Sequence, residues 1–168
     1  MSKSNIQAIE TEYKGWRMRS RLEARWAVYL DATGIRFDYE REGFELPSGW
    51  YLPDFWLPNE ETWAEVKGQV FSETQIQLCR ELALATHYNC LLLDGVPDLR
   101  TYNGWVWRQG QLQQGSAVVV QGLVWFDGPT FPLPAGLCSF YRLETFVHAA
   151  RAARFEHRAV QPYNWAKP

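Results

Sequence analysis

The sequence predicts a mixed α/β fold, an α+β arrangement around a mixed sheet, on three observations. A helical pattern of apolar residues covers Met18–Thr33, short segments rich in aromatic residues follow between turn signals, and a second helical pattern precedes the apolar run Cys90–Leu93. A length of 168 residues suits one domain with a single core. With 46% hydrophobic and 15% aromatic residues, the chain is too apolar to remain disordered.

The first half of the chain carries the predicted order αβββαβ. The helix over Met18–Thr33 is expected to stop at Gly34, and Ile35–Phe44 alternates apolar with charged residues as a strand does. Trp50–Leu57 and Thr62–Gly68 are two further predicted strands, and the turn residues between them have the spacing of a hairpin.

The second helix and the strand after it have local signals of their own. Ser72, with Gln75 three residues later, forms a capping-box signature that starts an amphipathic helix running to about His87. Asn89 is expected to close this helix in a left-handed conformation. Cys90–Leu93 is continuously apolar, as a strand buried on both faces requires.

The rest of the chain, about residues 101–158, extends this core. Thr101–Phe126 is expected to add one or two β-hairpins at a sheet edge, Pro129–Ser139 a loop with three prolines, and Leu143–His157 a terminal helix. Three tryptophans of the extension either stack on unpaired bases or pack within the fold, and packing is the expectation. They are Trp105, Trp107 and Trp125.

Charge and cysteine content exclude several classes of protein. A net charge of -2 argues against a protein that coats nucleic acid indiscriminately. No run approaches the roughly 20 apolar residues of a membrane span, and polar Met1–Glu12 lacks an apolar signal core, so a cytoplasmic location without a membrane partner is expected. Cys79, Cys90 and Cys138 are too widely spaced to suggest disulfides or a zinc site.

Three charged residues stand out in the predicted hairpin. Alternation along the strands places Glu65 and Lys67 on one face, and pairing can bring Asp54 of the partner strand beside them. An Asp and a Glu supply oxygen ligands for a hard divalent cation such as Mg²⁺. A nearby ammonium can activate water or stabilise charge on phosphate, so the combination suits phosphodiester hydrolysis.

An ordinary cross-strand salt bridge is the alternative explanation for these charges. Large apolar side chains surround Asp54 and Glu65, however, and a buried carboxylate without a partner costs several kcal/mol. Glu23 is a fourth candidate because it shares the apolar stripe of the first helix. It either approaches a metal or forms an intrahelical bridge to Arg19, and both interpretations stay open.

The whole pattern resembles the PD-(D/E)XK nuclease superfamily. A helix bears Glu23, one strand carries Pro53-Asp54, the next carries Glu65-Val66-Lys67, and a helix and a strand follow. The resemblance covers roughly residues 14–95 and implies a restriction-endonuclease-like core.

This resemblance also implies an activity and its cofactor. A Mg²⁺-dependent DNA endonuclease is expected, with Mn²⁺ able to substitute, and pairing into a homodimer stays open. The resemblance assigns the metal to Asp54, Glu65 and the backbone carbonyl of Val66, and it matches Glu23 to the family's helical acid, which could contact a metal-bound water or a second cation. Lys67 would assist the attacking water.

Basic and amide side chains elsewhere are candidate nucleic-acid contacts. They lie before and within the first helix, at the start of the second and along the last. The candidates are Lys14, Arg17, Arg19, Arg21, Gln75, Gln77, Arg151, Arg154 and Arg158. A solvated surface is the alternative for the two basic sets, and it is favoured for the last helix. Gln75 and Gln77 are candidates because many members of the family that the chain resembles carry a polar residue on this helix.

Three functions therefore remain open. The first is the metal-dependent endonuclease, and the second is a catalytically inactive module of the same fold that serves DNA binding or protein assembly. The third is a structural protein that binds partners through its tryptophans and holds its charges in salt bridges. The complete set of Asp54, Glu65 and Lys67 favours the first.

Overall fold

A mixed seven-stranded sheet lies at the centre of the structure, with helices on both faces. The computed structural model describes residues 9–127 and 141–155, except the side chains of 141–143. The sheet contains β3 (Asp38–Tyr39), β6 (Phe55–Leu57), β7 (Thr62–Lys67), β8 (Asn89–Asp94), β9 (Thr101–Arg108), β10 (Gln111–Val120) and β11 (Gly122–Asp127). The helices are α1 (Arg21–Thr33), α2 (Glu73–Thr86) and α3 (Tyr141–Ala152).

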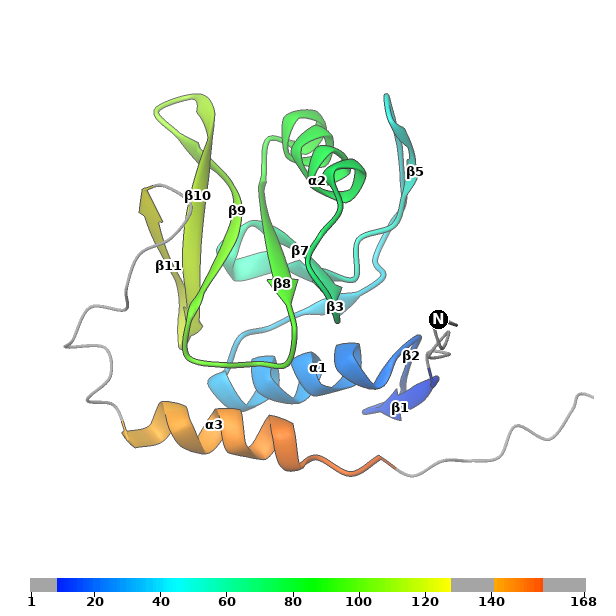
Figure 1. Ribbon diagram of the computed structural model, residues 1–168, viewed down its shortest axis with the longest axis vertical. Coiled ribbons are helices and arrows are strands. Elements are labelled where there is room, and N and C mark those ends of the chain that lie inside the picture. The colour runs from blue at the N-terminus through cyan, green and yellow to red at the C-terminus, as the bar shows by residue number, and fades with distance from the viewer. Residues whose placement is uncertain (1–8, 128–140, 156–168) are drawn as a thin grey trace, which may run out of the picture.

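The strand order in this sheet is β11-β10-β9-β8-β7-β6-β3. β7 and β8 run parallel, whereas the other neighbouring strands pair antiparallel. Helices α1 and α3 lie side by side on one face, and α2 covers part of the other (Figure 1). The mixed α/β class is confirmed, whereas the predicted order αβββαβ gains a β1–β2 hairpin before α1 and five strands in place of three between α1 and α2.

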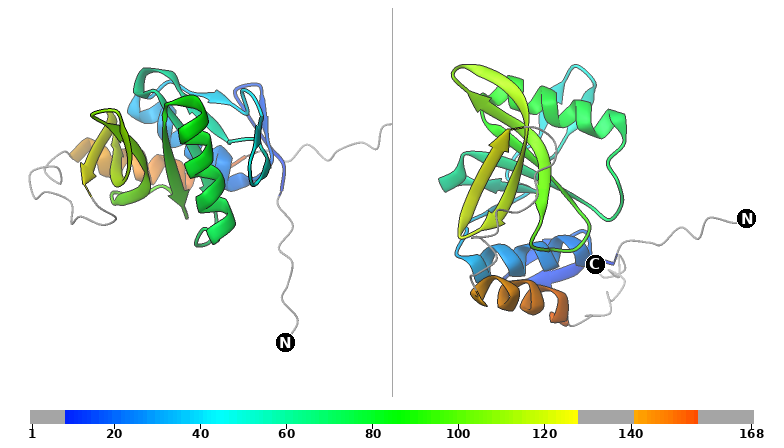
Figure 2. Two further views of the ribbon diagram at one scale, coloured as in Figure 1. Left: turned by 90° about the horizontal axis from the view of Figure 1, so that it is seen from above. Right: turned by 60° about the vertical axis from the view of Figure 1, so that its left-hand side comes forward.

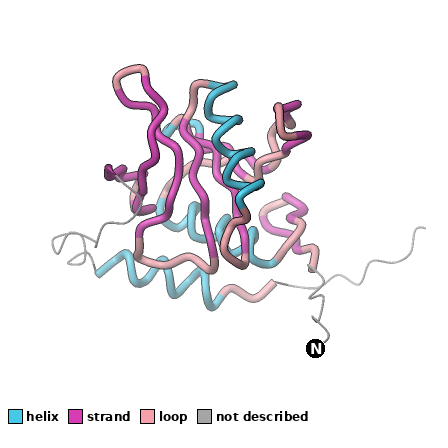
Figure 3. Tube along the Cα trace, turned by 45° about the horizontal axis from the view of Figure 1, so that its top comes forward, coloured by secondary structure: helices cyan, strands magenta, loops and turns pink. Residues whose placement is uncertain are grey.

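Two short hairpins stand apart from the main sheet. One is formed by β1 (Thr11–Tyr13) and β2 (Trp16–Met18), the other by β4 (Phe44–Leu46) and β5 (Gly49–Tyr51). The views in Figure 2 separate the three layers, and Figure 3 shows the helices on either side of the strands.

The first helix is shorter than predicted at its start. Met18 ends β2, and Ser20 caps the helix by accepting the Glu23 N–H at 3.1 Å. Met18, which the apolar spacing assigned to the helix, therefore pairs with Thr11 of β1 as part of a strand. Gly34 ends it as predicted, with a left-handed φ of 78°.

Two predicted strands are each divided. Ile35–Phe44 contains only β3 and the first residue of β4, because Glu40 has a left-handed φ of 44° that ends the extended run. Trp50–Leu57 becomes β5 and β6, since Pro53 has no N–H to continue a ladder. The predicted hairpin survives as β6 and β7, joined through a 3₁₀ turn at Pro58–Glu60.

The second helix begins and ends about where predicted, but a different residue closes it. Ser72 and Gln75 form the full capping box. His87, with φ of 60°, closes the helix in the left-handed conformation predicted for Asn89. Asn89 instead starts β8, where its N–H donates to the Glu61 carbonyl at 3.1 Å.

The extension adds β9, β10 and β11 to the β8 edge, as predicted. Trp105, Trp107 and Trp125 are half-buried there, and the Trp107 indole donates to the Ala83 carbonyl of α2 at 3.0 Å. Packing is thus their observed state. The predicted loop Pro129–Ser139 lies outside the described residues. The predicted terminal helix Leu143–His157 is present as α3, but it ends at Ala152, and residues 153–155 are not helical.

The strand β7 separates two apolar layers. Ala64 and Val66 face α1 and α3, whereas Trp63 packs with α2 residues on the other face. Glu65 and Lys67 share the face of Trp63 because side chains alternate along a strand. None of the described helices is long and apolar enough to cross a membrane.

Removal of the α2 cap tests this local account. Ser72→Ala leaves the Gln75 N–H without its acceptor, and we expect a loss of about 1 kcal/mol of unfolding free energy in urea. Ser72→Asp keeps a capping oxygen and is the matched control. Equal stability of Ser72→Ala and the native chain would show that this cap contributes nothing.

Candidate functional site

Asp54 lies immediately before β6, with only 3% of its surface exposed. Its Oδ2 accepts the Val66 N–H at 2.7 Å, and its carbonyl accepts the Glu40 N–H at 2.9 Å. The Arg19 guanidinium lies 3.4 Å from Oδ1. Asp54 is therefore held by its carboxylate to β7 and by its main chain to the residue after β3, just beyond the last β6–β7 pair, Phe55 with Ala64.

Glu65 is a second buried carboxylate, 5% exposed, in the middle of β7. The Tyr51 hydroxyl donates to Oε2 at 3.0 Å, and the Lys67 Nζ lies 2.8 Å from Oε1. Tyr51 also contacts the Cys79 Sγ at 3.1 Å, which connects Glu65 to α2. The predicted salt bridge of Lys67 thus exists, but it runs along one strand rather than across two.

Glu23 is the third buried carboxylate, and it caps α1. It accepts hydrogen bonds from the Tyr39 hydroxyl at 2.6 Å, the Ser20 hydroxyl at 2.6 Å and the Arg19 N–H at 3.0 Å. The predicted intrahelical bridge to the Arg19 side chain is not formed, since Arg19 precedes the helix. Its guanidinium instead pairs with Glu40 and Asp54.

These carboxylates act on one another electrostatically. Burial raises the pKa of Asp54 well above its ordinary value, and the negative charges of Glu65 and Glu23 raise it further. The Val66 N–H and the Lys67 ammonium lower it only in part. The ionised form of Asp54 is therefore under-compensated by the groups around it.

At Lys67, by contrast, the neighbouring charges favour the ionised form. Burial lowers its pKa, but the charge and hydrogen bond of Glu65 and the charge of Asp54 raise it, so that the pKa lies above its ordinary value. The side chain is consequently an ammonium ion at neutral pH. It serves as a fixed cation and not as a proton acceptor.

Acidic side chains outnumber basic ones in this group, which we call the charged cluster. Its members are Glu23, Glu40, Asp54 and Glu65, opposed by Arg19 and Lys67. One added divalent cation would balance the difference.

The donor atoms fit a hard divalent ion. Mg²⁺ binds through one or two carboxylates and retains several waters, and Asp54 and Glu65 provide that number. Val66 turns its N–H toward Asp54, and its carbonyl faces the same way because a strand residue directs both groups to one side. Within residues 9–127 and 141–155, no group of three or more His, Cys, Asp or Glu side chains is arranged so that it could hold a metal ion.

The predicted nucleic-acid contacts before α1 are dispersed. Lys14 and Arg17 belong to the β1–β2 hairpin, not to a helix, and pair with Asp31 and Glu10. Arg21 is the exposed first residue of α1. Of the described candidates, Arg19 is the one seen in contact with the charged cluster.

The other candidates have local partners or lie away from the cluster. Gln75 completes the capping box and Gln77 donates to Glu81 at 2.9 Å. Arg151 forms an ion pair with Asp98 at 2.8 Å, and exposed Arg154 follows the end of α3. Arg158 lies outside the described residues.

Sequence reasoning missed two tyrosines that position the site. Tyr39 and Tyr51 occupy predicted strands, where aromatic residues usually indicate core packing, and nothing in their spacing shows that their hydroxyls reach Glu23 and Glu65. A buried hydroxyl needs a polar partner, which is the one available signal.

Comparison with protein-family models, curated proteins and solved structures returned no match to this chain. The geometry of the site is therefore the basis for assigning it a function.

The under-compensated charge of Asp54 leads to a stability prediction. In EDTA at neutral pH, Asp54→Asn is expected to unfold at a higher urea concentration than the native chain, since the amide relieves repulsion and can still accept the Val66 N–H. Adding Mg²⁺ should stabilise the native chain and leave Asp54→Asn unchanged.

The exposed Glu45 provides a control, because Glu45→Gln removes a carboxylate that is not among the hydrogen-bond or ion-pair partners of Asp54 and Glu65. It should keep the Mg²⁺ response. An Asp54→Asn variant that is less stable in EDTA, yet equally stabilised by Mg²⁺, would contradict the electrostatic account.

Proposed function

We propose that this chain is a divalent-metal-dependent nuclease of the PD-(D/E)XK type that hydrolyses DNA phosphodiester bonds as an endonuclease. The observation that carries the proposal is the buried pair Asp54 and Glu65, with excess negative charge, beside a Lys67 that stays protonated. Such a pair costs stability in an apolar setting unless a cation joins it.

Asp54, Glu65 and the Val66 carbonyl would hold Mg²⁺ or Mn²⁺. When bound, a divalent cation polarises a phosphate oxygen and lowers the pKa of water, which makes water a nucleophile at neutral pH. The raised pKa of Asp54 supports this assignment, since a cation would favour its ionised form.

Lys67 supplies a positive charge for the reaction. Its ammonium is held 2.8 Å from Glu65, and 37% of the side chain is exposed, so a phosphate oxygen can reach it. There it would stabilise the negative charge that develops on the phosphoryl group. Tyr51 positions Glu65 by donating to its other oxygen.

Arg19 and Glu23 have supporting roles. Arg19 is anchored to Asp54 and Glu40, yet 55% of its side chain is exposed, so it can also meet the substrate backbone. Glu23 holds the Arg19 main chain and the N-terminus of α1 in place. It is a positioning residue in this proposal.

The reaction forms one bond and breaks one. A water oxygen attacks phosphorus, one phosphorus–oxygen ester bond breaks, and the water proton passes to solvent while the leaving oxygen gains a proton. The products are a phosphate monoester and a hydroxyl end. Pairing of two chains would allow both strands of a duplex to be cut.

The proposal predicts cleavage that depends on metal and on the cluster. Purified protein should cut DNA with Mg²⁺ or Mn²⁺ and not with EDTA. Asp54→Asn, Glu65→Gln and Lys67→Met should each lower the cleavage rate by about 100-fold or more, because each removes a group that stabilises the transition state. Product formation on plasmid, linear and branched DNA is the measurement.

Glu45→Gln is again the matched control, and it should cut at the native rate. Undiminished cleavage by Asp54→Asn and Lys67→Met would show that another site, or a contaminant, is responsible. Metal binding without any cleavage would favour the inactive DNA-binding module.

A further inference from the structure

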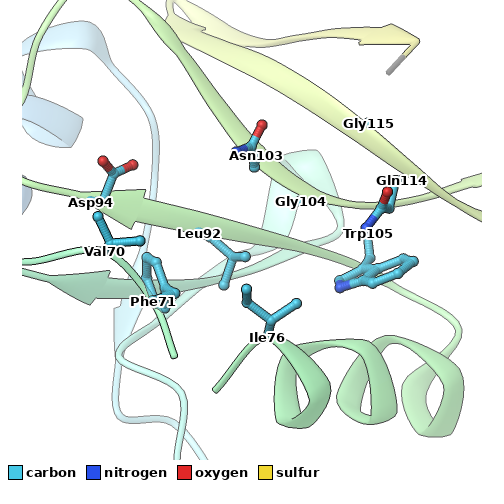
Figure 4. A pocket seen from close by; sticks show the side chains of 10 residues that line it. All are labelled: Val70, Phe71, Ile76, Leu92, Asp94, Asn103, Gly104, Trp105, Gln114 and Gly115. Atoms are coloured by element: carbon cyan, nitrogen blue, oxygen red, sulfur yellow. The ribbon is translucent and has the colours of Figure 1, made fainter. Parts of the chain in front are cut away.

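A pocket of about 350 Å³ lies on the α2 face of the sheet (Figure 4). Its walls come from β8, β9 and β10, from the segment before α2 and from the first turns of α2 itself. It takes no part in the contacts of the charged cluster described above.

The pocket exists because α2 covers only part of this face. The buried residues of the helix, among them Cys79 and Leu82, pack over Trp63 and Cys90. Phe71, before the helix, and Ile76, in its first turn, form one wall, and Leu92 forms the floor (Figure 4). The described residues leave the space above this floor open.

Strand register places the pocket next to the charged cluster. In the parallel pair β7–β8, Glu65 lies opposite Leu92 and Lys67 opposite Asp94. All four side chains share one face of the sheet, and neighbouring strands are about 4.8 Å apart. Leu92 and Asp94 line the pocket, so it begins one strand away from the proposed catalytic groups.

The lining combines a flat aromatic ring with amides. The half-buried Trp105 forms one wall, while the exposed amides of Asn103 and Gln114 stand above the apolar floor (Figure 4). An amide offers both a donor and an acceptor, which is the pattern that reads the edge of a nucleobase. Indole rings provide surfaces on which bases stack.

Charge at the pocket also suits a nucleotide. The Arg80 guanidinium lies over the Trp105 ring, 5.6 Å from its centroid, and can meet a backbone phosphate. The Asp94 carboxylate, paired with Arg100 at 2.9 Å, can accept a hydrogen bond from an exocyclic amino group.

We propose that this pocket receives one unpaired nucleobase of the strand that is cut, adjacent to the scissile phosphate. The volume is near the lower limit of ligand pockets, about 300–1,000 Å³, and suits a single base rather than a base pair. The substrate class is then single-stranded DNA, or duplex DNA with a flap, bulge or extruded base. This inference rests on the proposed nuclease function.

Binding in EDTA tests the pocket without cleavage. The probe is a single-stranded oligonucleotide of about 20 residues carrying one 2-aminopurine, whose fluorescence falls on stacking. We expect Trp105→Leu to weaken binding about tenfold or more and to abolish the fluorescence change. Asn103→Ala and Gln114→Ala, both at exposed positions, should weaken binding without affecting folding.

Gln113→Ala is the matched control, because Gln113 is exposed on the opposite face of β10 from Gln114. It should bind as the native chain does. Native-like binding by all three pocket variants, or no binding of single strands by the native chain, would overturn the proposal.

Cleavage with Mg²⁺ separates this proposal from the proposed function. If the native chain cuts DNA and the pocket variants cut every substrate equally well, the nuclease stands and the pocket assignment fails. If the pocket variants lose single-strand binding but the native chain cuts nothing, the pocket still binds an unpaired base, while the nuclease and the placement of that base beside a scissile phosphate fail.

Discussion

The Asp54 carboxylate accepts the Val66 N–H at 2.7 Å, at a point where the ladder between β6 and β7 has ended. The register of Phe55 with Ala64 would place the main chain of Pro53 opposite Val66, but Asp54 makes this bond with its side chain instead. A buried N–H is costly when unpaired, so this bond completes the strand edge. The same bond fixes the Asp54 carboxylate close to Glu65.

The closeness of Asp54 and Glu65 explains the arrangement of the other charged residues in the site. Two buried carboxylates in one place repel each other, and the neighbouring Arg19 and Lys67 compensate only part of their charge. The tyrosines at positions 39 and 51 hold the acidic side chains in place, which adds order but no positive charge. Buried carboxylate charge that its neighbours compensate only in part is more typical of functional centres than of structural salt bridges, and it is the basis for the proposed cation site.

Local chemistry made much of this fold predictable. The capping box at Ser72, the stop at Gly34 and the apolar run at β8 each depend on residues close in sequence, and each was confirmed. The errors have mixed causes. Pro53 divides a predicted strand for the local reason that it has no N–H, and the left-handed backbone at Glu40 ends another. Long-range strand pairing converts the start of the first predicted helix into β2.

The site shows the same division. Alternation along β7 predicts that Glu65 and Lys67 lie together, whereas the capping role of Glu23 and the hydroxyl contacts of Tyr39 and Tyr51 depend on tertiary packing.

A direct Mn²⁺ titration followed by electron paramagnetic resonance tests the central claim, that Asp54 and Glu65 together bind a divalent cation. The account predicts a bound ion in the native chain and in Glu45→Gln that is lost in Asp54→Asn and Glu65→Gln. Equal Mn²⁺ binding by all four proteins would contradict it.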